Sequence, residues 1–138
     1  MQLPDKYVNC TLFSLGDSAE MADSGLQDII DRKQVATSGS FDLLNEDDAN
    51  KPYEGKIEIV LDGTGQPGCA IQFWKVDTVK YSDVDEQFAV DEACDNLEEW
   101  VSIHKGYYKR KGNYSPDMKL YRLYFKVIEV FADEKKVA

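Results

Sequence analysis

The side chains that most often carry enzyme or metal chemistry are few in this sequence, and their spacing fits no metal site. There are three cysteines and a single histidine, namely Cys10, Cys69, Cys94 and His104. The cysteines form no Cys-x-x-Cys pair, and no Cys or Asp lies at metal-ligand spacing around His104. The sequence therefore predicts no bound metal and no cofactor. A thiol nucleophile is not indicated, because no histidine signature accompanies Cys69 or Cys94.

Two further features have a plain structural explanation. His104 shares the apolar stripe of a predicted helix with Trp100 and Tyr108, and a lone histidine on such a stripe is more often a core-edge residue than a catalyst. The glycine-rich turn over 63–68 is not a P-loop, because it lacks the Gly-Lys-Ser/Thr ending and opens into a strand. We expect Asp62 to cap this turn through its side chain, with ligand contact as the alternative.

Charge is unevenly distributed along the chain. The net charge is −10, which argues against a general electrostatic grip on nucleic acid. Residues 82–99 contain eight acids and no Lys or Arg, whereas residues 101–128 contain seven basic residues against Asp117 alone. The commoner explanation is two solvated surfaces of opposite sign. The alternative is a basic rim beside an acidic site, which would suit a phosphate-bearing ligand.

Length and composition favour one soluble domain over residues 1–138. A chain of 138 residues with 43% apolar residues can bury a core without disulfide or metal support. The odd number of cysteines suits a reducing cytosol. The N-terminus shows no signal-peptide pattern, and no apolar run approaches the roughly 18 residues that span a bilayer. We therefore expect a cytoplasmic protein with no membrane contact and a frayed tail over 132–138.

The first half of the chain predicts one helix and a β-hairpin. Asp17 or Ser18 can cap a helix that ends near Asp31, and residues 32–38 read as a short strand or a loop leading into one. Residues 43–53 are polar and are expected to form an exposed loop. Alternating apolar residues over 57–61 and 69–79 surround the glycine-rich turn, which is typical of a hairpin.

The second half predicts two helices and a closing strand. Ser82 can cap a short helix through Ala89, and a longer helix starts at Asn96, has Glu99 in capping-box position and ends near Gly112. Strict alternation over 119–131 predicts a long strand with one buried face. Strands with helices set apart indicate an α+β fold, and a small closed or partly closed barrel would best protect the strand edges.

Several of these segments carry a family resemblance. They are Phe13–Ser18 (FSLGDS), Arg32–Ser38 (RKQVATS), Leu61–Pro67 (LDGTGQP), Phe88–Glu92 (FAVDE) and Leu97–Trp100 (LEEW). Together they resemble the ASCH domain family, in its bacterial branch with the LDGTGQP motif, over about residues 12–131. The resemblance implies a PUA-like β-barrel with flanking helices and a cleft, linked to RNA-related or modified-nucleoside chemistry.

The resemblance also implies candidate catalytic residues. One branch of the family consists of small amidohydrolases that remove the acetyl group from acetylcytidine with a Lys, a Thr and a Glu. The Thr matches Thr37 and the Glu matches Glu92, but the Lys falls on Gln34. Lys33 is next to it and could take the Lys role only if the backbone shifted, because adjacent strand residues face opposite ways.

The departure at Gln34 changes the expected chemistry. Amide hydrolysis needs a nucleophile, a proton carrier and a group that stabilises the oxyanion. Gln34 could still donate a hydrogen bond through its amide, but it lacks the charge of a lysine. Loss of one such group typically lowers the rate by about 10²–10³. We therefore expect weak hydrolysis or binding without chemistry.

Three functional hypotheses follow. The first is a cleft that binds a nucleoside- or nucleotide-like small molecule and hydrolyses it weakly or not at all. Some residues are candidates for catalysis and others for binding the ligand. The catalytic candidates are Thr37, Glu92 and Lys33, and the ligand-binding candidates are Gln34, Ser38, Asp62, Gln72 and Arg122. The second is an RNA-binding PUA-like module that uses the basic stretch 105–126. The third is a non-catalytic interaction protein.

Overall fold

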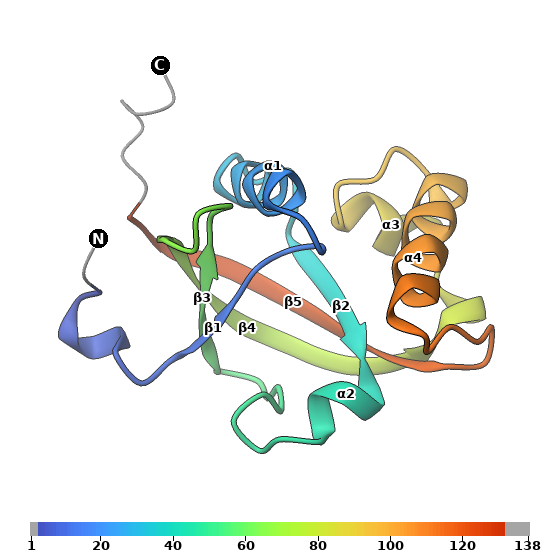
Figure 1. The fold of residues 1–138 in the computed structure, drawn as a ribbon, viewed down its shortest axis with the longest axis horizontal. Coiled ribbons are helices and arrows are strands. Elements are labelled where there is room, and N and C mark those ends of the chain that lie inside the picture. The colour runs from blue at the N-terminus through green and yellow to red at the C-terminus, as the bar shows by residue number, and fades with distance from the viewer. Residues whose placement is uncertain (1–2, 132–138) are drawn as a thin grey trace.

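A curled sheet of five strands forms the centre of the molecule (Figure 1). The computed structural model describes residues 3–131. The strand order is β1-β3-β4-β5-β2, with β1 parallel to β3 and every other pair antiparallel. The strands are β1 (Thr11–Phe13), β2 (Ala36–Ser40), β3 (Ile57–Leu61), β4 (Pro67–Lys80) and β5 (Lys119–Val130). This arrangement confirms the predicted α+β class, and the barrel is a partly open half-barrel.

The predicted hairpin is β3 and β4, and its turn packs tightly against the first helix. The Asp62 carboxylate accepts hydrogen bonds from the backbone N–H groups of Thr64 and Gln66, as an Asx-type turn requires. The Gly63 N–H donates to Asp23 at 2.6 Å. A Cβ at Gly63 would lie 2.5 Å from the Ala19 carbonyl oxygen, so the close approach needs glycine.

Helices cover the sheet on several sides (Figure 1). The α-helices are α1 (Ala19–Ile30), α2 (Phe41–Asn45), α3 (Glu86–Asp91) and α4 (Leu97–Lys111), and two 3₁₀ turns are η1 (Asp5–Tyr7) and η2 (Tyr81–Asp83). Ser18 caps α1 by accepting from the Met21 N–H, as the sequence predicted. Asn96 caps α4 by accepting from the Glu99 N–H, and Gly112 ends that helix with φ +76°.

Local predictions were wrong in two places. The predicted loop over 43–53 includes the end of α2, which Ser40 caps by accepting from the Leu43 N–H. The predicted cap of the short helix was Ser82, but this residue lies in η2, and the cap of α3 is Asp85, which accepts from the Phe88 N–H. The first error missed a short helix, and the second placed a helix start three residues too early.

Two apolar clusters hold the helices in place. One lies between α1 and the sheet and includes Leu26, Ile29 and Phe125. The other joins α3 and α4 to β2 and β5 through Phe88, Trp100 and other buried residues. Trp100 is fully buried, and its ring lies 5.4 Å from that of Tyr81 and 6.4 Å from that of Phe88. The second cluster therefore fixes α4 relative to the edge strand β2.

The described residues contain no helix long and apolar enough to cross a membrane. The expectation of a frayed tail over 132–138 lies outside the described residues.

The cap of α4 gives a stability prediction. Replacing Asn96 by Ala removes the acceptor for the Glu99 N–H, and we expect the free energy of unfolding to fall by about 1 kcal/mol. Urea denaturation of both proteins measures this loss. Asp95→Ala is the matched control, because Asp95 precedes the same helix end without acting as its cap. An equal loss in both variants would contradict the assignment of the stabilisation to the cap bond.

Candidate functional site

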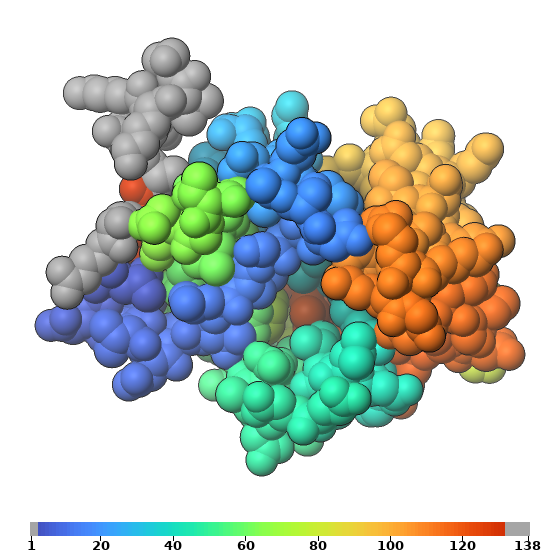
Figure 2. Space-filling view, viewed as in Figure 1, coloured from blue at the N-terminus to red at the C-terminus, as the bar shows by residue number. Residues whose placement is uncertain are grey.

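A cavity of about 620 Å³ opens between β2 and the helices around it. Figure 2 shows a hollow in the molecular surface. Three parts of the chain surround it, namely the segment that runs from β1 to α1, the helix α2 and the helix α4. Its lining includes Phe13 and Leu15 before α1, Thr37 and Ser38 on β2, and Tyr107 on α4. A volume of this size falls within the roughly 300–1,000 Å³ of small-molecule sites.

The end of α3 brings Glu92 to the edge of the sheet. Glu92 is the C-cap residue of α3, and the following Ala93 has φ +68°, so the chain turns sharply there. An isolated antiparallel bridge joins Gln34 to Glu92, and the Val35 N–H donates to the Asp91 carbonyl at 2.8 Å. Backbone pairing therefore places Glu92 beside Gln34 although 58 positions separate them in the numbering of the sequence.

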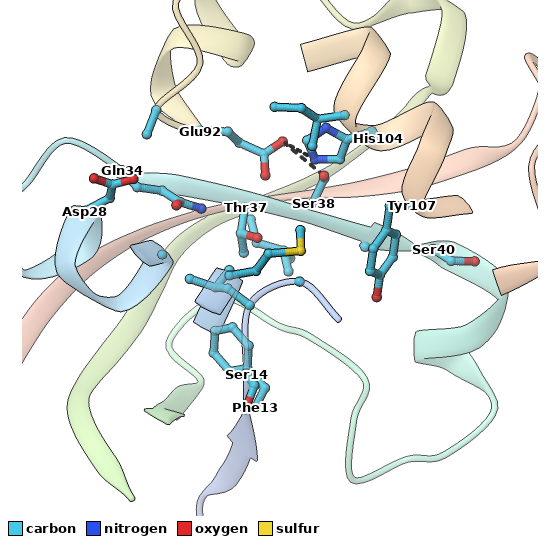
Figure 3. A pocket seen from close by; sticks show the side chains of 18 of the residues that line it. Phe13, Ser14, Asp28, Gln34, Thr37, Ser38, Ser40, Glu92, His104 and Tyr107 are labelled. Carbon is cyan, nitrogen blue, oxygen red and sulfur yellow. Dashed lines mark hydrogen bonds and ion pairs between the residues drawn. The ribbon is translucent and has the colours of Figure 1, made fainter. Parts of the chain in front are cut away.

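The Glu92 carboxylate is buried, and two side chains donate hydrogen bonds to one of its oxygens. Oε2 accepts from the indole Nε1–H of Trp100 at 2.5 Å and from the Ser38 hydroxyl at 3.0 Å. The same oxygen lies 3.6 Å from Nε2 of His104 (Figure 3). Burial raises the pKa of Glu92, while the charge of His104 and the hydrogen bonds from Trp100 and Ser38 act in the opposite direction.

His104 is held between Trp100 and Glu92. Its ring stacks on the Trp100 ring at 4.1 Å, and its Nδ1 lies 2.9 Å from the Trp100 carbonyl oxygen. A carbonyl oxygen can only accept, so Nδ1 carries a hydrogen and Nε2 faces the carboxylate. His104 thus lies at the edge of the core, as expected, and it also lines the cavity and faces its buried carboxylate.

Three buried polar side chains reach the cavity with hydrogen-bonding capacity to spare. The exposed fractions of Gln34, Thr37 and Glu92 are 7%, 8% and 9%, and all three line the cavity. Gln34 uses its Nε2 on the Ala36 carbonyl, which leaves its Oε1 without a partner within residues 3–131. The Thr37 hydroxyl likewise has no partner there, and the Glu92 carboxyl has acceptor capacity beyond its two bonds at Oε2. These side chains therefore offer a ligand in the cavity several acceptors and a hydroxyl within a small space.

The cavity lining is acidic. Its carboxylates are Glu20, Asp28, Glu58, Glu92 and Glu99, and within the described chain no Lys or Arg belongs to the lining. Glu58 has a neighbouring cation, because Lys56 Nζ lies 2.9 Å from its Oε2. The other acids face the cavity without such a lysine, so a negatively charged ligand would be repelled. No group of residues with metal-ligand geometry occurs in the part of the chain that the structure describes.

The structure brings together four of the eight residues proposed from the sequence. Gln34, Thr37, Ser38 and Glu92 line one cavity (Figure 3). Lys33 is exposed and lies outside the lining, as expected for the neighbour of an inward-facing strand residue.

The remaining three candidates are engaged elsewhere. Asp62 caps its own turn, and Gln72 donates to the Gly55 carbonyl at 3.0 Å. Arg122 forms a bidentate pair with Asp77 at 2.7 and 3.1 Å. None of the three belongs to the cavity lining. His104 and Asp28 line the cavity but were not proposed, and the one available signal was the position of His104 four residues after Trp100 on one helix face.

The fold and the site together match a known family. The chain matches the ASCH domain family over residues 11–129, which is most of its length. This protein therefore belongs to the ASCH domain family, as its motifs suggested. The family has a PUA-like fold that is often linked to RNA binding.

Solved structures agree with this assignment. The chain is similar to the crystal structure of a protein from Enterococcus faecalis V583, with 28% identity and a TM-score of 0.82 over 100% of this chain and 83% of that one. It is also similar in fold to an ASCH domain from Lactobacillus crispatus JV V101, with 23% identity and a TM-score of 0.80 over 91% of this chain and 83% of that one. No curated protein matches the chain.

Burial of Glu92 gives a prediction with a defined pH dependence. Because its pKa is raised in the folded state, its contribution to stability is present below the ordinary range of a glutamate and is lost as the pH rises. Glu92→Gln should therefore be as stable as the wild type or more so at pH 7, by about 1.4 kcal/mol for each pKa unit of the shift.

Denaturation at pH 7 and near pH 4.5 tests this prediction. The advantage of Glu92→Gln should shrink at the lower pH, where the wild-type carboxyl is closer to neutral. Glu98→Gln is the control, because Glu98 is an exposed acid of the same segment. A Glu92→Gln protein that loses stability at pH 7 but not at pH 4.5 would contradict the raised pKa.

Proposed function

We propose that this protein binds a nucleoside-like small molecule in the cavity beside β2. The observation that carries the proposal is the convergence of Gln34, Thr37 and Glu92, three buried polar side chains with unused hydrogen-bonding atoms. A flat heterocycle with several donors and acceptors on one edge would satisfy these atoms at once.

The walls of the cavity fit the remainder of such a ligand. Two aromatic residues from different elements line the cavity (Figure 3). They are Phe13, the last residue of β1, and Tyr107 on α4. Aromatic side chains stack on bases with little regard for their sequence. Leu12 and Ile103 are lining residues that are 52% and 45% exposed, so apolar surface lies at the mouth. This combination of an apolar wall and a few fixed polar groups is usual for small-molecule sites.

Weak amidohydrolase activity is the second part of the proposal. Thr37 would attack the acetyl carbonyl of an N-acetylated ligand and give up its proton to Glu92. Glu92 would then pass that proton to the leaving amine as the C–N bond breaks, and water would release acetate from Thr37. The chain has Gln34 where a lysine would stabilise the oxyanion, so slow turnover is expected.

RNA binding through the basic stretch 105–126 has less support. Two of its arginines are neutralised, since Arg110 pairs with Asp17 and Arg122 pairs with Asp77. Lys105 and Lys109 lie over the ring of Tyr114. The two ion pairs reduce the positive charge that this stretch can offer to a phosphate backbone.

Loss of the carboxylate gives the first test. Glu92→Ala should abolish nucleoside binding, because hydrogen bonds to a charged group contribute about 1.5–3 kcal/mol each and a ligand donor would lose its acceptor. A backbone-amide NMR titration with a nucleoside panel that includes acetylcytidine measures binding and folding in one spectrum. Shifts of the wild type should cluster at Gln34, Thr37 and Glu92.

Controls separate the site from the fold. Glu98→Ala removes an exposed acid from the same segment and should leave binding unchanged. Binding that persists in a folded Glu92→Ala protein would refute the site, and a wild type that responds to no nucleoside would refute the proposed ligand class.

Restoring a lysine gives the second test. Gln34→Lys should raise the rate of acetylcytidine hydrolysis by about 10²-fold, because a cation returns to the oxyanion position. Release of cytidine, followed by chromatography, measures this rate. Val35→Lys is the matched control, since Val35 is 39% exposed and lies outside the cavity lining. An equal rate in Gln34→Lys and the wild type would contradict the role assigned to position 34.

A further inference from the structure

The orientation of the Gln34 amide is fixed by its backbone partner. The side-chain Nε2 lies 3.1 Å from the Ala36 carbonyl oxygen. That oxygen can only accept, so the NH₂ group must face it and the amide oxygen must point elsewhere. Gln34 is 7% exposed and lines the cavity. Its Oε1 is therefore an acceptor that a ligand can reach and that nothing else within residues 3–131 uses.

The Glu92 carboxyl has a second oxygen that is turned away from His104 (Figure 3). The donors Trp100 and Ser38 both bind Oε2, and His104 faces that oxygen too. Two donors on one carboxyl oxygen are typical of an ionised group. In Figure 3 the carboxyl group of Glu92 lies between His104 and Thr37, with one oxygen turned to His104 and the other toward the cavity.

The charge of Glu92 depends on His104. Nδ1 of the imidazole carries a hydrogen because it faces the Trp100 carbonyl at 2.9 Å. If Nε2 were bare, its lone pair would oppose the lone pairs of Glu92 Oε2 at 3.6 Å. An Nε2 that carries a hydrogen would instead form an ion pair with the carboxylate.

Other ionisable groups near Glu92 do not supply a cation. Burial and the negative charge of Glu92 raise the pKa of Cys94 to about 12, and burial likewise raises the pKa of Tyr108, so both stay neutral at pH 7. Asp28 and Glu99 line the same cavity and are acids. In the described part of the lining, His104 is thus the group able to balance the charge of Glu92.

We propose that the inner wall of the cavity recognises an amino group of its ligand through two acceptors, the carboxylate of Glu92 and the amide oxygen of Gln34, with His104 as the positioning residue that keeps Glu92 ionised. The ligand class is a heterocycle with an exocyclic amine, in preference to its keto counterpart. A keto oxygen at this place would face two acceptors and find no donor. The acidic lining also disfavours a phosphate on the ligand. The inference rests on the proposed function and makes it specific.

Matched ligand pairs test the proposal. Cytidine and uridine, and adenosine and inosine, differ by an amino group against a keto group and by the hydrogen that the keto members carry on the adjacent ring nitrogen. The NMR titration gives a Kd for each. The amino member of each pair should bind at least about 10-fold more tightly, because the keto member leaves a buried charged group without its partner. A tenfold change in Kd corresponds to about 1.4 kcal/mol. Equal affinities, or a preference for the keto members, would overturn the proposal.

The role of His104 has its own readout. The side-chain carboxyl carbon of Glu92, followed by ¹³C NMR, should report an ionised group at pH 7 in the wild type and a neutral one in His104→Gln. The amino preference should disappear in that variant. Lys105→Gln is the control, since it removes an exposed cation from the adjacent position of α4. A protonated Glu92 in the wild type at pH 7, or an unchanged Glu92 in His104→Gln, would overturn the role of His104.

A fragment pair keeps this inference separate from the proposed function. If no nucleoside binds, the proposed function fails, and 4-aminopyrimidine and 4-pyrimidinone are then titrated at millimolar concentration. A response to 4-aminopyrimidine alone at Gln34 and Glu92 would support the acceptor pair without the nucleoside. A response to both fragments equally, to 4-pyrimidinone alone or to neither would overturn it.

Discussion

The burial of Glu92 where α3 meets the edge strand β2 is the constraint on which the site depends. Trp100 donates a hydrogen bond to the Glu92 carboxylate. It is also a fully buried member of the apolar cluster that joins α3 and α4. The backbone at Gln34 and Val35 pairs with Asp91 and Glu92. The packing that holds α4 on the sheet and the geometry of the carboxylate therefore cannot change independently.

An ionised carboxylate in such a place needs compensation. Removing a carboxylate from water costs several kcal/mol even after the protein relaxes, and two unit charges about 4 Å apart attract by roughly 4 kcal/mol at an effective dielectric constant of 20. In the proposed site His104, at 3.6 Å on α4, would supply an attraction of this kind, and Ser38 and Trp100 donate hydrogen bonds. Gln34 on the strand side is neutral and can act as an acceptor.

Features that depend on neighbouring residues could be predicted from the sequence, whereas contacts between distant elements could not. The start and end of α4 were predicted because Asn96 and Gly112 act within one turn of their own helix. Thr37 and Glu92 were proposed from the family resemblance, and the structure places both in the cavity. Arg122 was misassigned because its partner, Asp77, is set by the pairing of β4 with β5. The contact of His104 with Glu92 arises from the docking of α4 on α3, which no local pattern encodes.

The uneven charge of the chain follows in part from its helix ends. Within the acidic run, Asp85 caps α3, Glu86 accepts from the Leu97 N–H, and Glu99 accepts from the Asp95 N–H at the start of α4. The basic cluster Lys109–Lys111 lies in the last turn of α4. Acids at helix starts and bases at helix ends complement the helix dipole.

These charges therefore do not require a phosphate-binding rim. Glu92 differs from the other acids of the run, because it is buried and turns an oxygen to the cavity instead of capping a helix start. A site whose lining has carboxylates, and a histidine already engaged with one of them, offers its ligand acceptors for N–H groups and little for an anion. The electrostatics of the whole chain and the hydrogen-bonding pattern of the inner wall thus favour the same kind of ligand.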